Sequence, residues 1–381
     1  MVDLDLHRPL DLRGAEPATI GVEEEFFIAD PVTGVPVAKA DAVVRAARRL
    51  GVVLQLEVTQ VQVESNTPIC HGLADVREHL LAARSAAATA AACSGGQLLA
   101  AGVPLAGPGE LPITESSRYE RISRDYGALA AQYGVCGSHV HVGVPDRRTA
   151  VQVCNHLRPW LPVLLALTAN SPIYQGGDTG YASWRSILCG RWPCGGAPPY
   201  FTSPDHYDAV VDMMIGSGAV LDRAMVYWDV RVSSHLPTVE VRVSDVPATV
   251  DETVLLAVLV RALVMTAIEA DRRGVAAPRV SGEALRAAYW RAAHDGIAGS
   301  GIDLATGRCV PAGRLLHHLL DHVRPALART GELAAVAARL ARILDHGNGA
   351  VVQRRAFQHH HRLQDVRALL ADHTVQRHDP I

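Results

Sequence analysis

Lysine is almost absent from this 381-residue chain, in which Lys39 is the single lysine among 36 basic residues. A P-loop nucleotide-binding site needs the lysine of a Gly-Lys-Ser/Thr element, and the chain has no such element, so P-loop NTPases are excluded. An enzyme that forms a Schiff base would have to use Lys39, which lies in a polar turn after the first predicted strand. Any phosphate that this protein binds must therefore be held by arginine.

A strong net charge, an apolar leader and a disulfide pattern are missing as well. The formal net charge of −3 gives no electrostatic reason to expect nucleic acid or an anionic membrane as a partner. The first residues are acidic and contain no apolar signal region. The apolar stretch 254–270 is interrupted by Arg261 and Glu269, which indicates a buried helix and not a membrane span. Because seven cysteines without a recognisable pairing are typical of a reducing compartment, we expect a cytoplasmic protein with no nucleic-acid or membrane partner.

Apolar residues make up 49% of the chain, which is enough for a sizeable core. We expect residues 1–17 to form a loose tail and residues 18–381 to form a single catalytic domain, largely helical from about residue 250. Before that point, strand patterns alternate with helices expected at 38–50, 73–93, 151–170 and 205–223. Strands mixed with long helices predict an α+β fold whose sheet is mainly antiparallel and covered by helices on one face.

The first predicted strand, 21–28, carries three consecutive glutamates inside an apolar run. Alternate side chains of a strand share a face, so Glu23 and Glu25 lie together, about 7 Å apart along the strand, and Glu24 points the other way. A buried carboxylate is costly unless it is paired or bound to a metal. We therefore expect a shared role for Glu23 and Glu25, and a position at a helix-covered edge for Glu24.

The same alternation recurs in the segments 60–64, 137–144, 226–232 and 239–244, with a phase slip near Thr59 that predicts a bulge or turn after Glu57. An ordinary solvated face carries lysine, threonine, serine and scattered charges, whereas these polar faces collect acids, histidines and arginines. The residues concerned are Glu64, His139, His141, Tyr227, Asp229, Arg231, Glu240 and Arg242. Carboxylates gathered in this way repel one another unless a cation lies among them, so the pattern predicts a divalent metal site.

Carboxylate oxygens favour Mg²⁺ or Mn²⁺ over zinc, and arginine grips phosphate in a bidentate manner. Metal, phosphate and arginine together indicate phosphoryl transfer from a nucleotide. An alternative stays open at this point, because His139 and His141 could centre the zinc or iron site of a metal-dependent hydrolase or oxygenase. The tract His359 to His361 is interpreted as a solvated helix end.

With these residues in place, the chain resembles the glutamate–cysteine ligase type 2, or carboxylate–amine ligase, family. The resemblance runs from about residue 19 to about residue 270 and rests jointly on the segments 21–25, 62–68, 137–143, 181–186, 228–231 and 238–243. It implies a glutamine-synthetase-like fold, in which a curved antiparallel sheet forms an open funnel backed by helices. It also implies that ATP and Mg²⁺ activate a carboxylate as an acyl phosphate, which an amine then attacks.

The family's motifs imply roles for individual residues. The implied metal ligands are Glu23, Glu25, Glu64, His139 and Glu240. Arg231 and Arg242 resemble phosphate-binding arginines, and Asp229 is our candidate for the base that takes the proton of the amine, or for a residue that orients Arg231. For contacts with substrate or nucleotide we name Tyr181, Trp184, Arg185 and His141.

The identity of the two substrates stays open. Many members of the family carry Gly-Thr-His-Pro where this chain has Gly-Val-Pro-Leu at 102–105. The reaction is γ-glutamylcysteine synthesis or the same chemistry on another amino acid and amine, for example in secondary metabolism. The expected partners are small molecules, and a homo-oligomer is one of the open assembly states.

Overall fold

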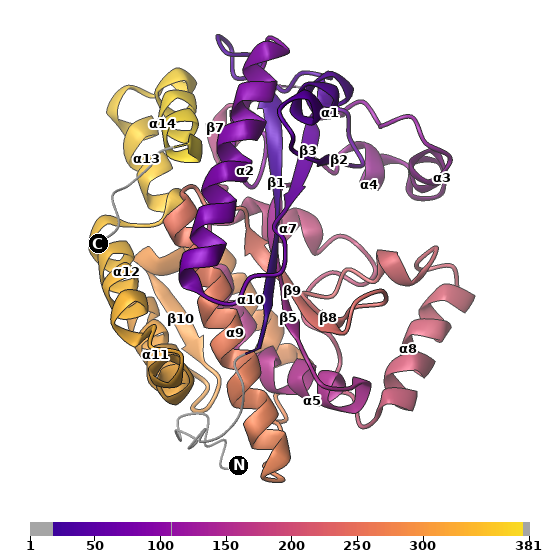
Figure 1. Ribbon diagram of the computed structural model, residues 1–381, viewed down its shortest axis with the longest axis vertical. Helices are drawn as coiled ribbons and strands as arrows, with labels where there is room; N and C mark the ends of the chain where they lie inside the picture. Colours follow the sequence, from indigo (N-terminus) through magenta and orange to yellow (C-terminus); the bar gives the residue numbers. More distant parts are fainter. Residues whose placement is uncertain (1–17, 108, 376–381) are drawn as a thin grey trace.

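The computed structural model describes residues 18–107 and 109–375, and its centre is a seven-stranded antiparallel sheet (Figure 1). Its strands are β1 (Ile20–Ala29), β2 (Leu54–Leu56), β3 (Gln62–Asn66), β4 (Gln97–Leu99), β5 (Gly137–Gly143), β8 (Val230–Val232) and β9 (Thr238–Asp245). Their order is β2-β3-β1-β5-β9-β8, with β4 also paired to β1, and every pairing is antiparallel. The sheet is open, and the predicted mixture of helices with an antiparallel sheet is confirmed.

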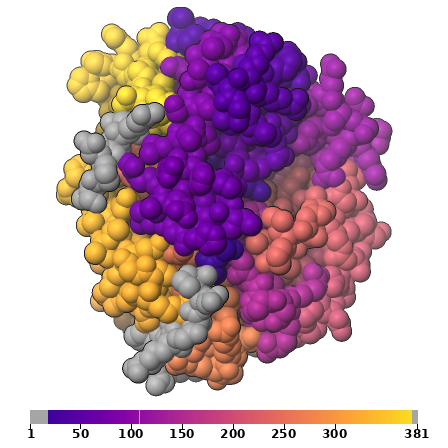
Figure 2. Space-filling view, in the orientation of Figure 1, coloured from indigo at the N-terminus to yellow at the C-terminus, as the bar shows by residue number. Residues whose placement is uncertain are grey.

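The described residues also form helices, several of which pack on the apolar face of this sheet. The N-terminal and central ones are α1 (Ala40–Arg49), α2 (Leu73–Cys93), α3 (Ser117–Tyr126), α4 (Ala128–Ala131), α5 (Arg147–Leu157), η1 (Arg158–Trp160), α6 (Leu161–Thr168), α7 (Trp184–Cys189), α8 (Pro204–Gly216) and η2 (Arg223–Met225). The C-terminal ones are α9 (Val250–Arg272), α10 (Gly282–Asp295), η3 (Gly296–Ala298), α11 (Ala312–Arg329), α12 (Leu333–His346), α13 (Gly349–His360) and α14 (Leu363–Val375). Figure 2 shows the C-terminal helices, in orange and yellow, along one flank of the N-terminal part.

The main core lies between the sheet and the long helix α9. Valines on alternate positions of β1, β5 and β9 point into it, among them Val22, Val140 and Val241. Helix α9 begins at a capping box in which Thr249 and Glu252 bond to each other's backbone. By length and hydropathy α9 could cross a membrane, but 94% of its most apolar window is buried inside the protein, as expected for a core helix.

The apolar face also holds Glu24, as the alternation predicted. Its carboxylate is fully buried and pairs with Arg84 of α2, which donates from Nε to Oε2 at 2.9 Å and from Nη2 to Oε1 at 2.6 Å. Thr253 of α9 donates its hydroxyl to the same carboxylate at 2.7 Å. Glu24 therefore fastens the sheet to two helices. The expected helix cover is confirmed, but the expected edge position is wrong, because β1 lies between β3 and β5.

Several predicted boundaries are wrong, each for a local reason. The helix expected at 151–170 begins earlier, where Asp146 caps α5, and is broken at Pro159 into η1 and α6. The strand expected at 226–232 is only β8, because Asp222 caps the short helix η2 just before it. The segment 181–186, which carries part of the family resemblance, enters α7 at Trp184, with Ser183 as its cap.

Short hairpins went unpredicted. β6 (Ile173–Tyr174) pairs with β7 (Gly177–Asp178), and β10 (Ser300–Asp303) pairs with β11 (Arg308–Pro311) inside the part expected to be helical. The helix expected at 205–223 ends early, at Gly216 of α8. Other predictions are confirmed: α2 has the expected bounds, a turn separates β2 from β3, and the exposed His359 and His360 end α13. The predicted tail at 1–17 lies outside the described residues.

Candidate active site

Antiparallel pairing places the polar residues of the central strands side by side. Glu25 of β1 lies opposite Glu64 of β3, and Glu23 lies opposite His139 of β5. These pairs share one sheet face, because the apolar neighbours of each residue point into the core behind it. The polar face predicted from alternation in separate strands is therefore one continuous surface.

The same face continues across β9 to β8 through Glu240. His141 and Arg231 both lie opposite Glu240 in the register. Arg231 donates from Nε to Oε2 of Glu240 at 2.7 Å and from Nη2 to Oε1 at 3.1 Å, and Arg242 donates to the same carboxylate. Burial would raise the pKa of Glu240, but Arg242 and Arg231 hold it well below its usual range.

A first acidic group consists of Glu25, Glu57 and Glu64, whose carboxylates offer oxygens that all lie within 4.8 Å of one another. Burial and the charge of Glu25 raise the pKa of Glu57 to about 7, while burial and Glu57 raise the pKa of Glu64 to about 10. Three carboxylates so close are stable only with shared protons or with a cation between them. This donor set fits a divalent ion that prefers oxygen ligands.

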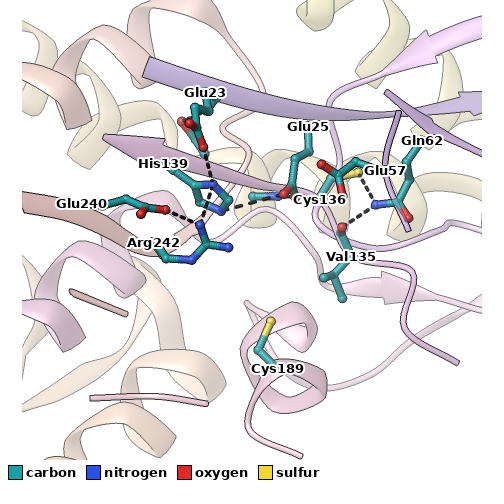
Figure 3. Close-up of polar contacts among 12 residues, drawn as sticks. Glu23, Glu25, Glu57, Gln62, Val135, Cys136, His139, Cys189, Glu240 and Arg242 are labelled. Atoms are coloured by element: carbon teal, nitrogen blue, oxygen red, sulfur yellow. Dashed lines mark hydrogen bonds and ion pairs between the residues drawn. The ribbon is translucent and has the colours of Figure 1, made fainter. Parts of the chain in front are cut away.

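Glu57 is the candidate ligand that sequence reasoning missed. It follows β2, directly before the turn that connects to β3, so it stands outside the alternation that identified the others. The phase slip near Thr59 marked this turn, and an acid placed beside such a break was the available signal. Figure 3 shows Glu57 beside Glu25.

A second group consists of Glu23, His141 and Glu240, again with donor atoms within 4.8 Å of one another. His139 lies between the two groups, with Nδ1 at 3.0 Å from Glu23 and Nε2 at 3.8 Å from Glu25 (Figure 3). Burial and Arg242 lower the pKa of His139 to about 4, which keeps its ring neutral and able to bind a metal. Burial would raise the pKa of Glu23, but hydrogen bonds with His139 and His141 lower it strongly.

Arg185 adjoins the first group from the side of α7, as a buried cation. The first residue of β5 is glycine for this reason: a Cβ on Gly137 would lie 2.3 Å from Nη2 of Arg185. The backbone N–H of Gly137 also donates to Oε2 of Glu25 at 2.6 Å. Arg185 borders a small cavity of ≈ 60 Å³ beside Glu25 and His139, and also a larger one of ≈ 660 Å³ on its other side.

Three predicted residues lie apart from these groups. Asp229 precedes β8 and lines the larger cavity, where burial raises its pKa against the opposing effects of Tyr289 and Arg185. Tyr181 and Trp184 pack edge to face, with ring centroids 5.3 Å apart, and border neither of the cavities that Arg185 borders. The expected shared face of Asp229 with Arg231 fails because the strand begins only at Val230.

Comparison with known proteins gives the family. The family described as "Glutamate-cysteine ligase family 2(GCS2)" matches residues 19–371. This chain belongs to it. A protein of Mycobacterium sp. (strain KMS) with the name "Putative glutamate--cysteine ligase 2-2" is 52% identical over 94% of this chain and 98% of its own length. A Nocardia farcinica protein with the corresponding name ending in 2-1 is 53% identical over 93% of this chain and 92% of its own.

Solved structures support the fold of this family member. The glutamate–cysteine ligase of Francisella tularensis, solved in complex with AMP, has a TM-score of 0.67 at 14% identity, covering 97% of this chain and 91% of that one. A bifunctional glutathione synthetase from Pasteurella multocida also has a TM-score of 0.67 at 14% identity, covering 94% and 52%. By family and homology, the chain is an ATP-dependent ligase that forms carbon–nitrogen bonds. The alternative of a hydrolase or oxygenase has no support in these comparisons.

Proposed function

We propose that this protein joins a carboxylate to an amine by way of an acyl phosphate, with ATP as phosphoryl donor and Mg²⁺ or Mn²⁺ as cofactor. The observation that carries the proposal is the pair of adjoining ligand groups, Glu25–Glu57–Glu64 and Glu23–His141–Glu240, on one sheet face. These two groups would hold divalent cations, which would offset the negative charge of nucleotide phosphates and of a substrate carboxylate. The substrates that we propose are glutamate and cysteine, the pair in the names of the relatives.

The residues of this chain take distinct parts in the proposed reaction. His139 is neutral and lies between the two groups, so its ring can add a nitrogen ligand to either of them. When bound, Mg²⁺ offsets the negative charge of the phosphates and of the carboxylate that is activated. Arg242 borders the small cavity beside His139 and Glu25, where it can stabilise charge that spreads over the transferred phosphoryl group.

Arg231 has a positioning part in this proposal. Besides its two bonds to Glu240, its Nη1 donates to the backbone oxygens of Ala224 at 3.0 Å and Val226 at 2.8 Å. Four of the five N–H donors of its guanidinium are therefore used inside the protein. We propose that Arg231 holds Glu240 in place, and that Arg242 is the arginine nearer to phosphate.

The segment 102–105, where this chain has Gly-Val-Pro-Leu in place of the family's Gly-Thr-His-Pro, does not argue against cysteine or glutamate as substrates. All four residues of this segment are buried, and Val103 packs against Val135 and Leu188. A Cβ on Gly102 would lie 2.9 Å from both Asp245 and Ser171, so glycine is required there by packing. None of these residues borders the two cavities beside Arg185. We further propose a cytoplasmic enzyme with its catalytic domain at 18–381.

The test is release of ADP from ATP and Mg²⁺ in the presence of glutamate and cysteine, then of glutamate with each other amino acid. We expect ADP to appear only when both a carboxylate and an amine substrate are present. Formation of the amide is followed by mass spectrometry. No ADP with any pair, together with tightly bound zinc or iron, would favour a site centred on His139 and His141 instead.

A further inference from the structure

The larger cavity beside Arg185 is separate from the two acidic groups and has a different lining. Its ≈ 660 Å³ are enclosed by α7, the loop 190–199 and α10. Charged and polar side chains of both signs line it, notably Arg158, Arg185, Asp229 and Tyr289. None of the carboxylates in the two metal-ligand groups borders it. Arg185 borders both this cavity and the small one beside Glu25, so a molecule bound here would lie next to the candidate active site.

Arg158 is a buried cation without an acidic partner. Only 4% of it is exposed, and its Nε donates to the backbone oxygen of Pro198 at 2.8 Å. Its Nη1 is buried and has no hydrogen-bond partner, and no ion pair joins Arg158 to an acid within 18–107 and 109–375. Arg84 and Arg261, which are also deeply buried, each pair with a glutamate, whereas Arg185, 5% exposed, has no ion pair among the described residues either.

A buried arginine without an acidic partner is a candidate binding site for an anion. An unpaired buried charge costs several kcal/mol, so proteins keep one only where something else offsets it. The cavity supplies no carboxylate to Arg158, and burial lowers the pKa of its guanidinium accordingly. A ligand carboxylate would fill the free Nη1 with a charge-assisted hydrogen bond.

The same cavity holds an acid that suits an ammonium group. Asp229 is partly buried near the Tyr289 hydroxyl, which is itself buried and has no hydrogen-bond partner among the described residues. Tyr289 also lies near Arg158, so the cation and the acid flank one side chain. A free α-amino acid carries a carboxylate and an ammonium group on neighbouring carbons, and this arrangement of charges matches both.

We infer that this cavity binds the amino acid that supplies the amine, with Arg158 receiving its carboxylate and Asp229 its ammonium group. The inference rests on the proposed function. Asp229 takes one proton from the ammonium nitrogen, whose electron pair then forms the C–N bond at the acyl phosphate carbon. The C–O bond to phosphate breaks, phosphate leaves with that electron pair, and it carries away the second proton of the nitrogen.

The experiment compares L-cysteine with cysteamine, which has the same amine and thiol but no carboxylate. The variants are Arg158→Met and Arg158→Lys, and the matched control is Arg148→Met, which removes an exposed arginine of α5 paired with Asp271. With wild type and control we expect kcat/KM for L-cysteine to exceed that for cysteamine by on the order of 100-fold. Arg158→Met should lose this preference through a raised KM for L-cysteine, with a much smaller effect on kcat/KM for cysteamine, while Arg158→Lys keeps part of the preference.

Thermal unfolding separates this subsite from a structural role. Because Arg158 is an unpaired buried charge, Arg158→Met should unfold at the same or a higher temperature than wild type. An equal loss of kcat/KM for L-cysteine and cysteamine in Arg158→Met would overturn the subsite. A second measurement records the rise in Tm that each of the twenty L-amino acids gives.

The second measurement keeps the two proposals apart. We expect at least one L-amino acid to stabilise wild type and Arg148→Met but not Arg158→Met. If no amino acid does so, the subsite is wrong even where ADP is released. If one does so and no pair of substrates releases ADP, the ligase function is wrong and the cavity is still an amino-acid site.

Discussion

At the scale of single residues, the three successive glutamates of β1 fall into two kinds, one on the core side of the sheet and two on its polar side. Glu24 is neutralised by Arg84 and Thr253 on the core side, whereas Glu23 and Glu25 face other acids and histidines on the polar side. The first arrangement stabilises the fold. The second one costs stability in the absence of a cation, because like charges are held together.

Substitution of these neighbours should separate folding from activity. Glu25→Gln removes a charge from the acidic group, so we expect it to release ADP only at background level while its Tm stays equal to or above that of wild type. Glu24→Gln leaves Arg84 buried without its partner and should cost about 3 to 5 kcal/mol of unfolding free energy. Thermal unfolding and ADP release measure both variants, and a folded, fully active Glu25→Gln would refute our metal site.

Glu57 offers a test of the residue that the alternation did not reveal. Glu57→Gln should weaken Mg²⁺ binding by about 10-fold or more, since one carboxylate of the first group is lost. Mg²⁺ titrations followed by isothermal calorimetry give the affinity. Glu115→Gln, at a residue outside both ligand groups, serves as the control that should bind Mg²⁺ like wild type. Equal affinities of Glu57→Gln and wild type would remove Glu57 from the site.

At the scale of secondary structure elements, long strands were predictable and short ones were not. β1, β5 and β9 repeat the two-residue period often enough to show which residues share a face. β8 has three residues, so the predicted two-residue period was extended wrongly to Asp229, which precedes the strand. The pairing of strands also joins residues that are distant in sequence, and no local pattern states which strands become neighbours.

Arg158 illustrates a different limit. In sequence it is one arginine in an amphipathic helical pattern, which favours an exposed position. The chain breaks its helix there, at Arg158–Trp160, and buries the side chain against the loop 190–199. Its missing counter-ion is a property of the folded molecule, which the sequence alone does not show.

The junction of β5 with α7 gives a prediction at this scale. Gly137→Ala would bring a Cβ to 2.3 Å from Nη2 of Arg185 and 3.1 Å from the backbone oxygen of Ser244. We expect Arg185 to be displaced and kcat/KM to fall by on the order of 100-fold, since a misplaced group in an active site costs about that much. The control is Gly216→Ala at the end of α8, where a Cβ meets nothing within 4 Å. Wild-type kinetics in Gly137→Ala would refute the close approach.

At the scale of the whole molecule, the acidic groups couple stability to pH and to metal. The folded-state pKa values of Glu57 and Glu64 lie above that of a free glutamate, at about 7 and about 10. Between pH 5 and 7 the folded protein therefore holds protons that the unfolded chain has released. A state that binds more protons loses stability as the pH rises, so these groups destabilise the metal-free fold increasingly up to and above neutral pH.

We accordingly expect the Tm of EDTA-treated protein to fall between pH 5.5 and pH 8. Excess Mg²⁺ should reverse most of this fall, because it binds the ionised carboxylates, and at 100 times its Kd it would contribute about 2.7 kcal/mol. The slope should be smaller in Glu57→Gln than in wild type. Differential scanning calorimetry measures each case, and a metal-free Tm that rises over this pH range would contradict the assignment.

The spread of ligands along the chain also sets the order in which they become available during synthesis. The group of Glu25, Glu57 and Glu64 is encoded within the first part of the chain, whereas the other group needs Glu240 of β9. At roughly 5 to 20 residues per second, a ribosome needs about 10 to 40 s between Glu23 and Glu240. A nascent chain can therefore bind a cation at the first group well before β9, which carries Glu240 of the second group, has been synthesised.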